Sequence, residues 1–382
     1  MGKMRTKTIG IDARFYGEAG PGRYVKNIIS HLERVDNHNK YVLFLREEGF
    51  STYQPRNSNF SKVLADYKWY SWEEQIGFLF EILKCRLDLL YVPHFNVPVL
   101  YPGILVTAIP DLIMHSYSTE KGTTLPKPYF KFKKFVYKIV VLWAVIRSKR
   151  VLVPSNDVLN DFLKAFPFIS RSKYIVAYEG VDPSYENVTP DPDEVLRKYR
   201  VKKPFLLYVS SMYEHKNVSG LIEMFKILIS RFGYKGQMVL IGKRDKFSAE
   251  VQKRIISEDL SGRILMPGMD TYVTDPEVAS FRAEADAYVF PSFKEGFSLT
   301  PLEAMSVGLV CVISDIPCHR EIYGDSVLYF NPADPNDIAK KVNLVITNRD
   351  LRESLIKKGY ERVKKYDWME TAKITLDVFE NV

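Results

Sequence analysis

The feature that most constrains the fold is a regular alternation of short apolar runs with segments of helical periodicity. The apolar runs lack strict polar alternation, which indicates strands buried on both faces. Helical segments such as Arg23–Arg34 and Trp72–Arg86 lie between them, which is typical of βαβ crossovers and a parallel sheet. The strands predicted in the first half are residues 6–14, 40–45, 87–93, 103–110, 150–155 and 173–180.

This pattern restarts after a polar, proline-bearing stretch, NVTPDPDEV, at residues 187–195. We therefore expect an α/β protein of two doubly wound, Rossmann-like units, with ligands at the carboxyl ends of the strands in a cleft between the units. A last helix over Trp368–Glu380 is expected to pack back on the first unit. The strands predicted in the second half are residues 204–210, 237–242, 263–268, 286–292 and 309–314.

The composition excludes several other classes of protein. With 46% hydrophobic and 26% charged residues, the chain is not intrinsically disordered. Its three cysteines, Cys85, Cys311 and Cys318, have neither disulfide-framework nor metal-site spacing, which favours a reducing compartment. The start has no signal-peptide core, and no apolar run is long enough to span a membrane. We expect a cytoplasmic protein.

No metal site is predicted. His319 stands beside Cys318, but no further ligand has a useful spacing. The pair Asp191-Pro192-Asp193 resembles the acidic pair of metal-dependent transferases, but it lies in the polar stretch that joins the two units. A solvated linker is the better interpretation of that pair.

The net charge of +8 is concentrated in residues 121–150, which carry nine Lys or Arg and no Asp or Glu. One basic segment indicates one anionic surface or ligand, and no nucleic-acid-binding motif accompanies it, so we expect no nucleic acid partner. In the same segment, apolar residues recur at i, i+3, i+4 and i+7, which predicts a helix. This apolar stripe consists of Phe132, Phe135, Val136, Ile139, Trp143 and Ile146.

Two interpretations of this helix remain open. In one, the apolar stripe packs on the sheet and the lysines are solvated. In the other, an aromatic and basic surface with Lys131, Lys134 and Lys138 contacts anionic lipid at the inner face of the membrane.

The most informative stretch is EGFSLTPLEAMSVG, residues 295–308. Thr300-Pro301 is typical of an N-cap followed by proline at the first helical position. An exposed helix start has free N–H groups and a positive dipole end, which bind anions. Glu295 and Glu303 flank this start. Carboxylates beside an anion site suit a ligand that has hydroxyls as well as phosphate, and a nucleotide sugar has both.

Six segments in order resemble the retaining glycosyltransferases of family 4, which have the GT-B fold. The Glu-x₇-Glu stretch is followed by residues 312–339, and residues 9–28 look like the family's amino-terminal glycine loop. The remaining similar segments are VLVPSNDVLNDFL with YEGVD (151–163 and 178–182), SSMYEHKNVSGLIEMF (210–225) and YDWMETAKITLDVF (366–379). The resemblance covers nearly the whole chain.

The resemblance implies a donor site mainly on the second domain, with a glycine loop of the first domain that lets the backbone approach the diphosphate or the acceptor. Glu303 would accept hydrogen bonds from the donor ribose, and Glu295 would contact the donor sugar. Lys216 would neutralise the diphosphate leaving group. The implied donor-binding residues are completed by Phe297, Ser298, Leu299, Thr300, Ser211, Gly20 and Gly22.

Two departures from the family pattern concern phosphate and acceptor contacts. Relatives often place an arginine about five residues before the lysine, whereas this chain has Ser210-Ser211-Met212-Tyr213-Glu214 there. Relatives also often have a His-Asp pair where this chain has Pro110-Asp111. Asp111 is retained as a candidate catalytic residue, and His94, at another strand end, is a candidate acceptor contact.

The resemblance implies a metal-independent retaining enzyme that needs no cofactor. It would move a hexose from a nucleotide diphosphate sugar, such as GDP-mannose or UDP-glucose, to a hydroxyl of a glycan or lipid-linked acceptor in surface polysaccharide or glycolipid assembly. The alternative is a catalytically weak nucleotide-sugar-binding protein of the same fold. The expected domains are an acceptor domain at 1–190, a donor domain at 191–365 and a C-terminal helix at 366–382 that packs on the first domain.

Overall fold

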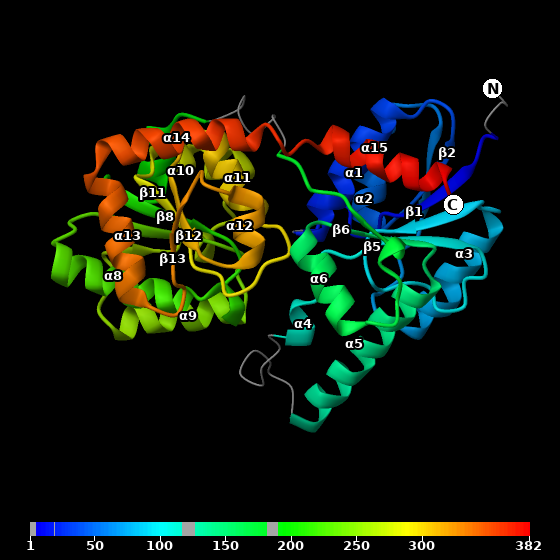
Figure 1. Ribbon diagram of the computed structural model, residues 1–382, viewed down its shortest axis with the longest axis horizontal. Helices are drawn as coiled ribbons and strands as arrows, with labels where there is room; N and C mark the ends of the chain where they lie inside the picture. The colour runs from blue at the N-terminus through cyan, green and yellow to red at the C-terminus, as the bar shows by residue number, and fades with distance from the viewer. Residues whose placement is uncertain (1–4, 19, 117–126, 182–189) are drawn as a thin grey trace. The chain divides into compact units, whose positions relative to one another are not determined.

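The computed structural model describes residues 5–18, 20–116, 127–181 and 190–382. The chain divides into two compact units, each built on one parallel sheet (Figure 1). Unit 1 comprises Met1–Gly180 together with Asp367–Val382, and unit 2 comprises Val181–Tyr366. The predicted α/β class with two Rossmann-like units is confirmed.

In the described part of unit 1, the sheet has seven parallel strands in the order β3-β2-β1-β4-β5-β6-β7. The six predicted strands are all present: β2 has the predicted bounds, and the other five are shorter than predicted. The strand β3 was missed because FSKVL is short, half polar and lies at the sheet edge, so it has no continuous apolar run. The strands are β1 (Thr8–Asp12), β2 (Lys40–Leu45), β3 (Phe60–Leu64), β4 (Leu89–Val92), β5 (Ile104–Ala108), β6 (Arg150–Val153) and β7 (Tyr174–Val176).

Helices cover both faces of this sheet, which explains why its strands are apolar on both sides. One core contains Ile28 from α1 and Phe379 from α15, and the other contains Val141 from α5 and Phe162 from α6. The helices of unit 1 are α1 (Pro21–Val35), α2 (Glu47–Thr52), the π-helical turn η1 (Glu74–Phe78) with α3 (Leu79–Lys84), α4 (Ile113–Ser116), α5 (Lys127–Arg147), α6 (Asn156–Ala165), η3 (Arg171–Lys173) and α15 (Trp368–Glu380).

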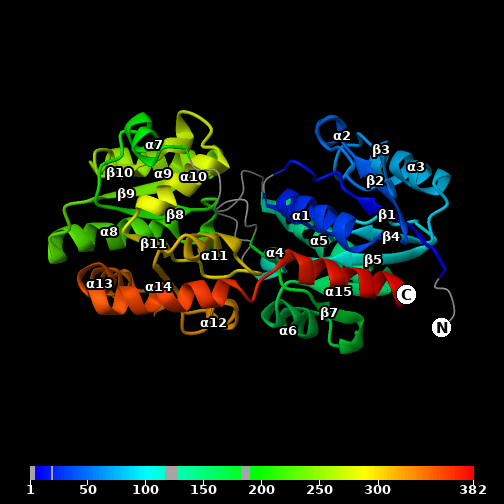
Figure 2. The same cartoon turned by 90° about the horizontal axis from the view of Figure 1, so that it is seen from above.

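The C-terminal helix α15 returns to unit 1 and lies beside α1, as predicted (Figure 2). Its first residue, Trp368, is 1% exposed and meets the ring of Tyr24 at 5.6 Å between ring centroids. At its other end, the Lys7 ammonium donates to the carbonyl oxygens of Phe379 and Val382 at 2.8 and 2.9 Å. The aromatic contact and the capped end together fix the last helix on the first unit.

The described part of unit 2 holds a six-stranded parallel sheet in the order β10-β9-β8-β11-β12-β13. The sequence predicted five of these strands and missed β13, a three-residue strand after a turn. The strands are β8 (Phe205–Val209), β9 (Gln237–Ile241), β10 (Ile264–Leu265), β11 (Ala287–Phe290), β12 (Cys311–Ser314) and β13 (Leu328–Phe330).

The helices of unit 2 again alternate with the strands. Asp191 caps the first of them by accepting from the backbone N–H of Asp193 at 3.0 Å, so this acidic pair begins a helix. The helices are α7 (Pro192–Lys198), η5 (Glu214–Lys216), α8 (Val218–Phe232), α9 (Lys246–Ser257), η6 (Pro267–Met269), α10 (Asp275–Glu284), α11 (Leu299–Ser306), α12 (Pro317–Tyr323), α13 (Pro335–Thr347) and α14 (Arg349–Val363).

One interpretation of the basic segment is wrong. The apolar stripe of α5 does not pack on the sheet, because all six of its side chains are exposed, from 38% at Trp143 to 62% at Phe135. The sheet is instead covered by Val141, Ala144 and Val145, which are fully buried. None of the helices described is both long and apolar enough to cross a membrane.

Candidate functional site

The loop after β8 holds Lys216 in a fixed position. Asn217, directly after it, has φ of 55°, a left-handed conformation that Asn tolerates better than most residues. Its side chain caps α8 by accepting from the Gly220 N–H at 3.1 Å, and it donates to the carbonyl oxygens of Pro291 and Pro332 at 3.2 and 2.8 Å. Asn217 therefore ties the lysine loop to the loops that follow β11 and β13.

Lys216 and Glu295 form a largely buried ion pair. The Lys216 Nζ to Glu295 Oε1 distance is 2.6 Å, and the side chains are 14% and 6% exposed. A backbone hydrogen bond from Phe293 to the His215 carbonyl, at 2.8 Å, holds the two loops together. Burial by itself would raise the pKa of Glu295, but the charge and hydrogen bond of Lys216 outweigh it and lower that pKa. Glu295 is therefore ionised at neutral pH.

The helix α11 begins at Leu299, two residues earlier than the predicted start at Pro301. The residue that turns the chain into the helix is Ser298, whose φ of 72° lies in the left-handed region. Its side chain makes no capping hydrogen bond, and its buried Oγ has no hydrogen-bond partner among the described residues. Strained backbone and unused polar groups of this kind are typical of ligand sites.

The predicted N-cap Thr300 lies inside the helix. Its Oγ1 accepts a hydrogen bond from the Tyr288 hydroxyl at 2.9 Å, so its side chain joins the helix start to strand β11. Phe297 is 3% exposed and meets Tyr366 edge-on. The packing of Phe297 thus holds the backbone just before α11. The start of α11 provides N–H donors at the carboxyl edge of the sheet.

Glu303 lies in the second turn of α11 and pairs with Arg282 from α10. Their side chains are 2% and 4% exposed. Sequence reasoning missed Arg282 because nothing in its neighbourhood marks it, and only the fold brings it to a residue 21 positions away. A buried carboxylate that is held by a guanidinium keeps one orientation.

Together these groups make a site suited to a ligand with both phosphate and hydroxyl groups. Lys216 and the start of α11 attract anions, whereas Glu295 is a hydrogen-bond acceptor for hydroxyls. Ser211, which is half-buried, lies in the loop between β8 and Lys216, and its carbonyl accepts from the Tyr208 hydroxyl at 2.7 Å. Within the described ranges, no group of three or more His, Cys, Asp or Glu is placed to hold a metal ion.

The predicted glycines lie in unit 1, at the start of α1. Gly20 is the N-cap of that helix with φ of 71°, a conformation that costs other residues free energy. A Cβ added to Gly22 would stand 2.4 Å from the Phe15 carbonyl oxygen. Gly22 is therefore required by packing of the loop on the helix, whatever the loop binds.

His94 belongs to a buried polar network at the carboxyl ends of β1 and β4. Its Nδ1 accepts from the Asn96 backbone N–H at 3.1 Å, and the Asn96 side chain donates to Glu74 at 2.8 Å. Arg14 completes the network with bonds to Asp12 at 2.8 and 2.7 Å. Burial lowers the pKa of His94 to about 4, so the ring is neutral and carries its proton on Nε2.

Asp111 lies between β5 and α4, two residues before α4 begins at Ile113. Its Oδ1 accepts from the Ile113 N–H at 2.8 Å, which is a turn-forming role. Its charge also acts on Glu179, a half-buried residue of unit 1 that sequence reasoning missed. Burial raises the pKa of Glu179 to about 7, with Arg23 lowering it and Asp111 raising it further. Glu179 therefore exchanges a proton near neutral pH.

The three predicted acceptor-side lysines all lie on α5, in unit 1. Lys131 and Lys138 are exposed and Lys134 is half-buried. The site residues thus fall into separate groups: Lys216, Ser211, Glu295, Glu303 and the start of α11 in unit 2, and the glycines, His94, Asp111 and the lysines in unit 1.

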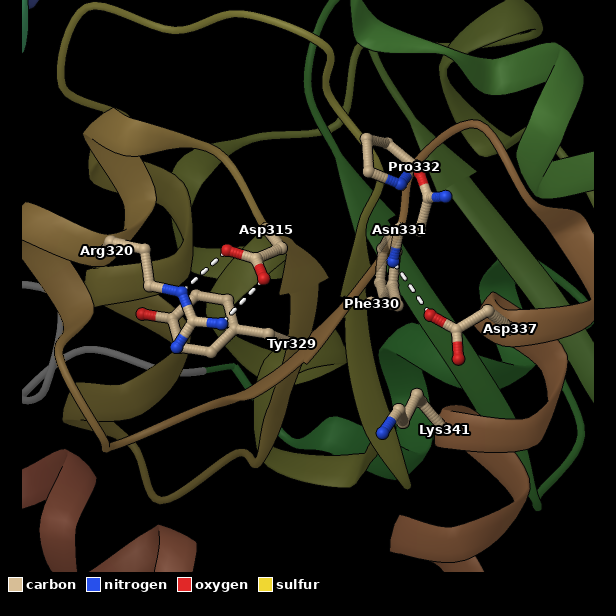
Figure 3. A pocket seen from close by; sticks show the side chains of 8 residues that line it. All are labelled: Asp315, Arg320, Tyr329, Phe330, Asn331, Pro332, Asp337 and Lys341. Atoms are coloured by element: carbon tan, nitrogen blue, oxygen red, sulfur yellow. Dashed lines mark hydrogen bonds and ion pairs between the residues drawn. The ribbon is translucent and has the colours of Figure 1, made fainter.

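A separate pocket of about 450 Å³ opens at the carboxyl ends of β12 and β13 (Figure 3). Two of its four charged groups pair with one another, since Arg320 binds Asp315 through two hydrogen bonds of 2.6 Å. Asp337 accepts from the Asn331 backbone N–H at 2.8 Å. No predicted site residue lines it. Its lining consists of Asp315, Arg320, Tyr329, Phe330, Asn331, Pro332, Asp337 and Lys341.

Residues 194–362 match the family described as Glycosyl transferases group 1. The chain is 28% identical over 238 residues to the O-antigen chain mannosyltransferase B of Escherichia coli, and this match covers 61% of each protein. It is 24% identical over 313 residues to the O-antigen chain mannosyltransferase RfbU of Salmonella typhimurium, covering 81% of this chain and 79% of that protein. The chain thus spans about three fifths of the first relative and about four fifths of the second.

Solved structures are similar in fold to nearly the whole chain. The HepE protein of Anabaena, solved in complex with UDP-glucose, superposes with a TM-score of 0.75 at 13% identity, covering 98% of this chain and 100% of that one. At this identity the likeness concerns the fold. Residues 194–362 thus match the glycosyl transferases group 1 family, and the chain has the GT-B fold.

Proposed function

We propose that the protein transfers a hexose from a nucleotide diphosphate sugar to a hydroxyl of a glycan or lipid-linked acceptor in surface polysaccharide assembly. The observation that carries the proposal is the ion pair of Lys216 and Glu295, which stands in the family-matched part of the chain with the left-handed start of α11 at Ser298. The names of the mannosyltransferase relatives support the assignment to polysaccharide assembly.

In the proposed reaction, the bond from the sugar C1 to the diphosphate oxygen breaks and a bond from C1 to the acceptor oxygen forms. The acceptor hydroxyl loses its proton to the departing diphosphate, and the nucleoside diphosphate leaves. Lys216 and the N–H groups at the start of α11 stabilise the charge that grows on the diphosphate. A lysine suits this role because its ammonium is a flexible point charge.

The resting ion pair fits this reaction. Donor entry would turn Lys216 towards the diphosphate, and Glu295 would accept hydrogen bonds from the sugar hydroxyls. Glu303, held by Arg282, would accept from the ribose. Glu295 precedes the start of α11 in the chain and Glu303 follows it. A ligand that has both phosphate and hydroxyl groups can therefore bind Lys216 and the helix start through its phosphates and the two carboxylates through its hydroxyls.

Two finer features belong to the proposal. We propose that the reaction is retaining, with leaving-group departure and attack on the same face, because neither carboxylate is held as a nucleophile: Glu295 is paired with Lys216 and Glu303 with Arg282. We also propose that no metal is needed, because Lys216 and the helix start supply the positive charge. We place the reaction in the cytoplasm, where the three free cysteines remain reduced.

The test begins with donor binding. A ligand at 100 times its Kd stabilises a protein by about 2.7 kcal/mol, so a thermal-shift screen with GDP-mannose, UDP-glucose, ADP-glucose and dTDP-glucose identifies the donor. Lys216→Met should remove the stabilisation by that donor, whereas Lys364→Met, in an exposed pair, should retain it. If none of the four donors raises the melting temperature, the assignment of a nucleotide-sugar site is wrong.

The finer features have their own readouts. Transfer in the presence of EDTA should equal transfer with Mg²⁺, and loss of transfer with EDTA would contradict metal independence. The anomeric configuration of the product, measured by NMR, should match that of the donor, and an inverted product would contradict retention.

A further inference from the structure

The exposed apolar stripe of α5 lies directly opposite the side of the helix that packs on the sheet. At 3.6 residues per turn, its six side chains fall in a sector about 100° wide. The buried residues Val141 and Val145 lie on the far side of the helix. Figure 1 shows α5 on the outer side of unit 1, with its first turns extending beyond the other helices there. The stripe is therefore presented to the surroundings from Phe132 to Ile146.

The exposed apolar area exceeds what a water-facing helix ordinarily carries. Phe132 and Phe135 are 61% and 62% exposed, and Ile139 is 50% exposed. At roughly 200 Å² for each fully exposed large side chain, the six residues of the stripe expose on the order of 600 Å². Patches of this size on single proteins mark interaction sites.

The apolar surface continues beyond α5 through hydrogen-bonded neighbours. The Trp143 indole N–H donates to the Val99 carbonyl at 3.2 Å, and the Val99 N–H donates to Gln75 of η1 at 2.9 Å. Leu100, in the loop between them, is 74% exposed. This loop links the stripe to a second exposed apolar face, on η1 and α3.

This second face also follows helical spacing. Trp72, Ile76 and Phe80 recur every four residues and are 84%, 55% and 60% exposed. We call the stripe of α5, the loop 97–101 and this second face the docking face. Two tryptophans, Trp72 and Trp143, lie on it, and tryptophan is enriched where proteins meet the boundary between lipid and water.

Basic residues border the stripe on both sides. Around the helix axis, Lys133 lies about 100° to one side of Phe132 and Lys131 lies about 100° to the other side. Lys138 precedes Ile139 as Lys131 precedes Phe132, so it lies on the same side of the stripe as Lys131. All three lysines are exposed. Lys134 lies on the side nearer the sheet and is half-buried, so it does not border the stripe. Residues 121–150 contain no Asp or Glu, so the border of α5 has one sign of charge.

We propose that the docking face binds the surface of an anionic membrane, with the apolar stripe inserted among the lipid headgroups and Lys131, Lys133 and Lys138 against their phosphates. An apolar stripe with lysines on both borders is typical of helices that lie in the membrane interface. A protein partner would explain the apolar area, but it would not require the lysines on both borders. The proposal concerns a surface separate from the donor site and does not depend on catalysis.

The experiment is sedimentation of the full chain with vesicles of phosphatidylcholine, with and without phosphatidylglycerol. Wild-type protein should bind the anionic vesicles and dissociate as salt is added. Neutralising three bordering lysines should weaken binding roughly a hundredfold, at about fivefold each. The test variant carries Lys131→Gln, Lys133→Gln and Lys138→Gln, and the control with the same charge change carries Lys235→Gln, Lys340→Gln and Lys357→Gln, which are exposed lysines of unit 2.

The apolar arm of the experiment uses Phe135→Ser with Ile139→Ser. Because both side chains are exposed, this variant should fold and melt as the wild type does, yet fail to bind vesicles. Tryptophan fluorescence of the wild type should shift to the blue with anionic vesicles, and Trp143→Phe should reduce the shift while binding persists.

Three results would overturn the proposal. The first is equal vesicle binding by the wild type and the lysine variant. The second is a dimer in the wild type that Phe135→Ser with Ile139→Ser converts to a monomer, since the face would then be an interface between copies. The third is salt-sensitive binding to single- or double-stranded nucleic acid without binding to anionic vesicles.

Discussion

Replacing Lys216 with methionine leaves Glu295 buried without its counter-charge. Breaking a fully buried ion pair in this way costs about 3–5 kcal/mol. The side chains here are 14% and 6% exposed, so we take the lower end and expect a loss of about 3 kcal/mol in the free energy of unfolding at pH 7. With a urea slope of about 2 kcal/mol per M, the midpoint should fall by roughly 1.5 M.

The loss should depend on pH. In the wild type, Lys216 outweighs burial and holds the pKa of Glu295 below its ordinary value of 4.5. In Lys216→Met, burial is no longer opposed, and the pKa rises above that value. At neutral pH the folded variant then holds a charge that burial disfavours, whereas well below pH 4.5 the carboxyl is neutral in folded and unfolded states. The deficit should therefore shrink as the pH falls.

Urea unfolding followed by far-ultraviolet circular dichroism measures both effects. The four tryptophans all lie in unit 1, so fluorescence would not report unit 2 directly. The double variant with Glu295→Gln should recover most of the lost stability, because no buried charge remains. Lys364→Met, which removes a partner from a pair 68% exposed on both sides, should leave the midpoint unchanged. A double variant as unstable as Lys216→Met would refute the reasoning.

The other predictions concern stability and its pH dependence. Arg282→Met should cost about 3–5 kcal/mol in urea unfolding by stranding the Glu303 carboxylate, and a cost near zero would contradict the buried pair. Trp368→Ala should lower the free energy of unfolding by about 3–5 kcal/mol by opening a cavity beside Tyr24. The fluorescence of the remaining tryptophans should then change at a lower urea concentration than in the wild type. The pKa of His94 is lowered from 6.5 to about 4, so between these pH values the unfolded chain binds a proton on this histidine and the folded chain does not. The free energy of unfolding should therefore fall by roughly 3 kcal/mol as the pH falls from 6.5 to 4, and His94→Asn should lessen this fall.

The sequence predicted the parts of the fold that long apolar runs specify. The strands β1 and β8 and the last helix were found because burial on both faces, or a strong helical period, leaves a continuous pattern. The strands β3 and β13 were missed because a short strand at a sheet edge needs no such run.

Site residues near one another in the sequence were predictable, whereas those brought together by the fold were not. The helix start after Glu295 can be inferred from its local sequence. Arg282 cannot, because only the fold brings it from α10 to Glu303 of α11, where the two form a buried ion pair. The start of α11 was placed two residues late, because Pro301 is a common first helical residue, while the left-handed turn at Ser298 has no reliable marker in a non-glycine residue.

The apolar stripe of α5 gives a related lesson. Helical periodicity shows that apolar residues share one face, but it does not show whether that face meets the sheet or the surroundings. In α5 the sheet is covered by the smaller residues Val141, Ala144 and Val145, and the larger aromatic residues point away. Only the structure distinguishes these two cases.

The central claim is that the groups around Lys216 drive release of a nucleoside diphosphate from a sugar donor. The most direct measurement is the rate of that release by purified protein, with the donor found in the thermal-shift screen, for the wild type, Lys216→Met and Lys364→Met. We predict turnover by the wild type and Lys364→Met and a loss of about 100- to 1,000-fold in Lys216→Met. Release by Lys216→Met at the wild-type rate would contradict the claim.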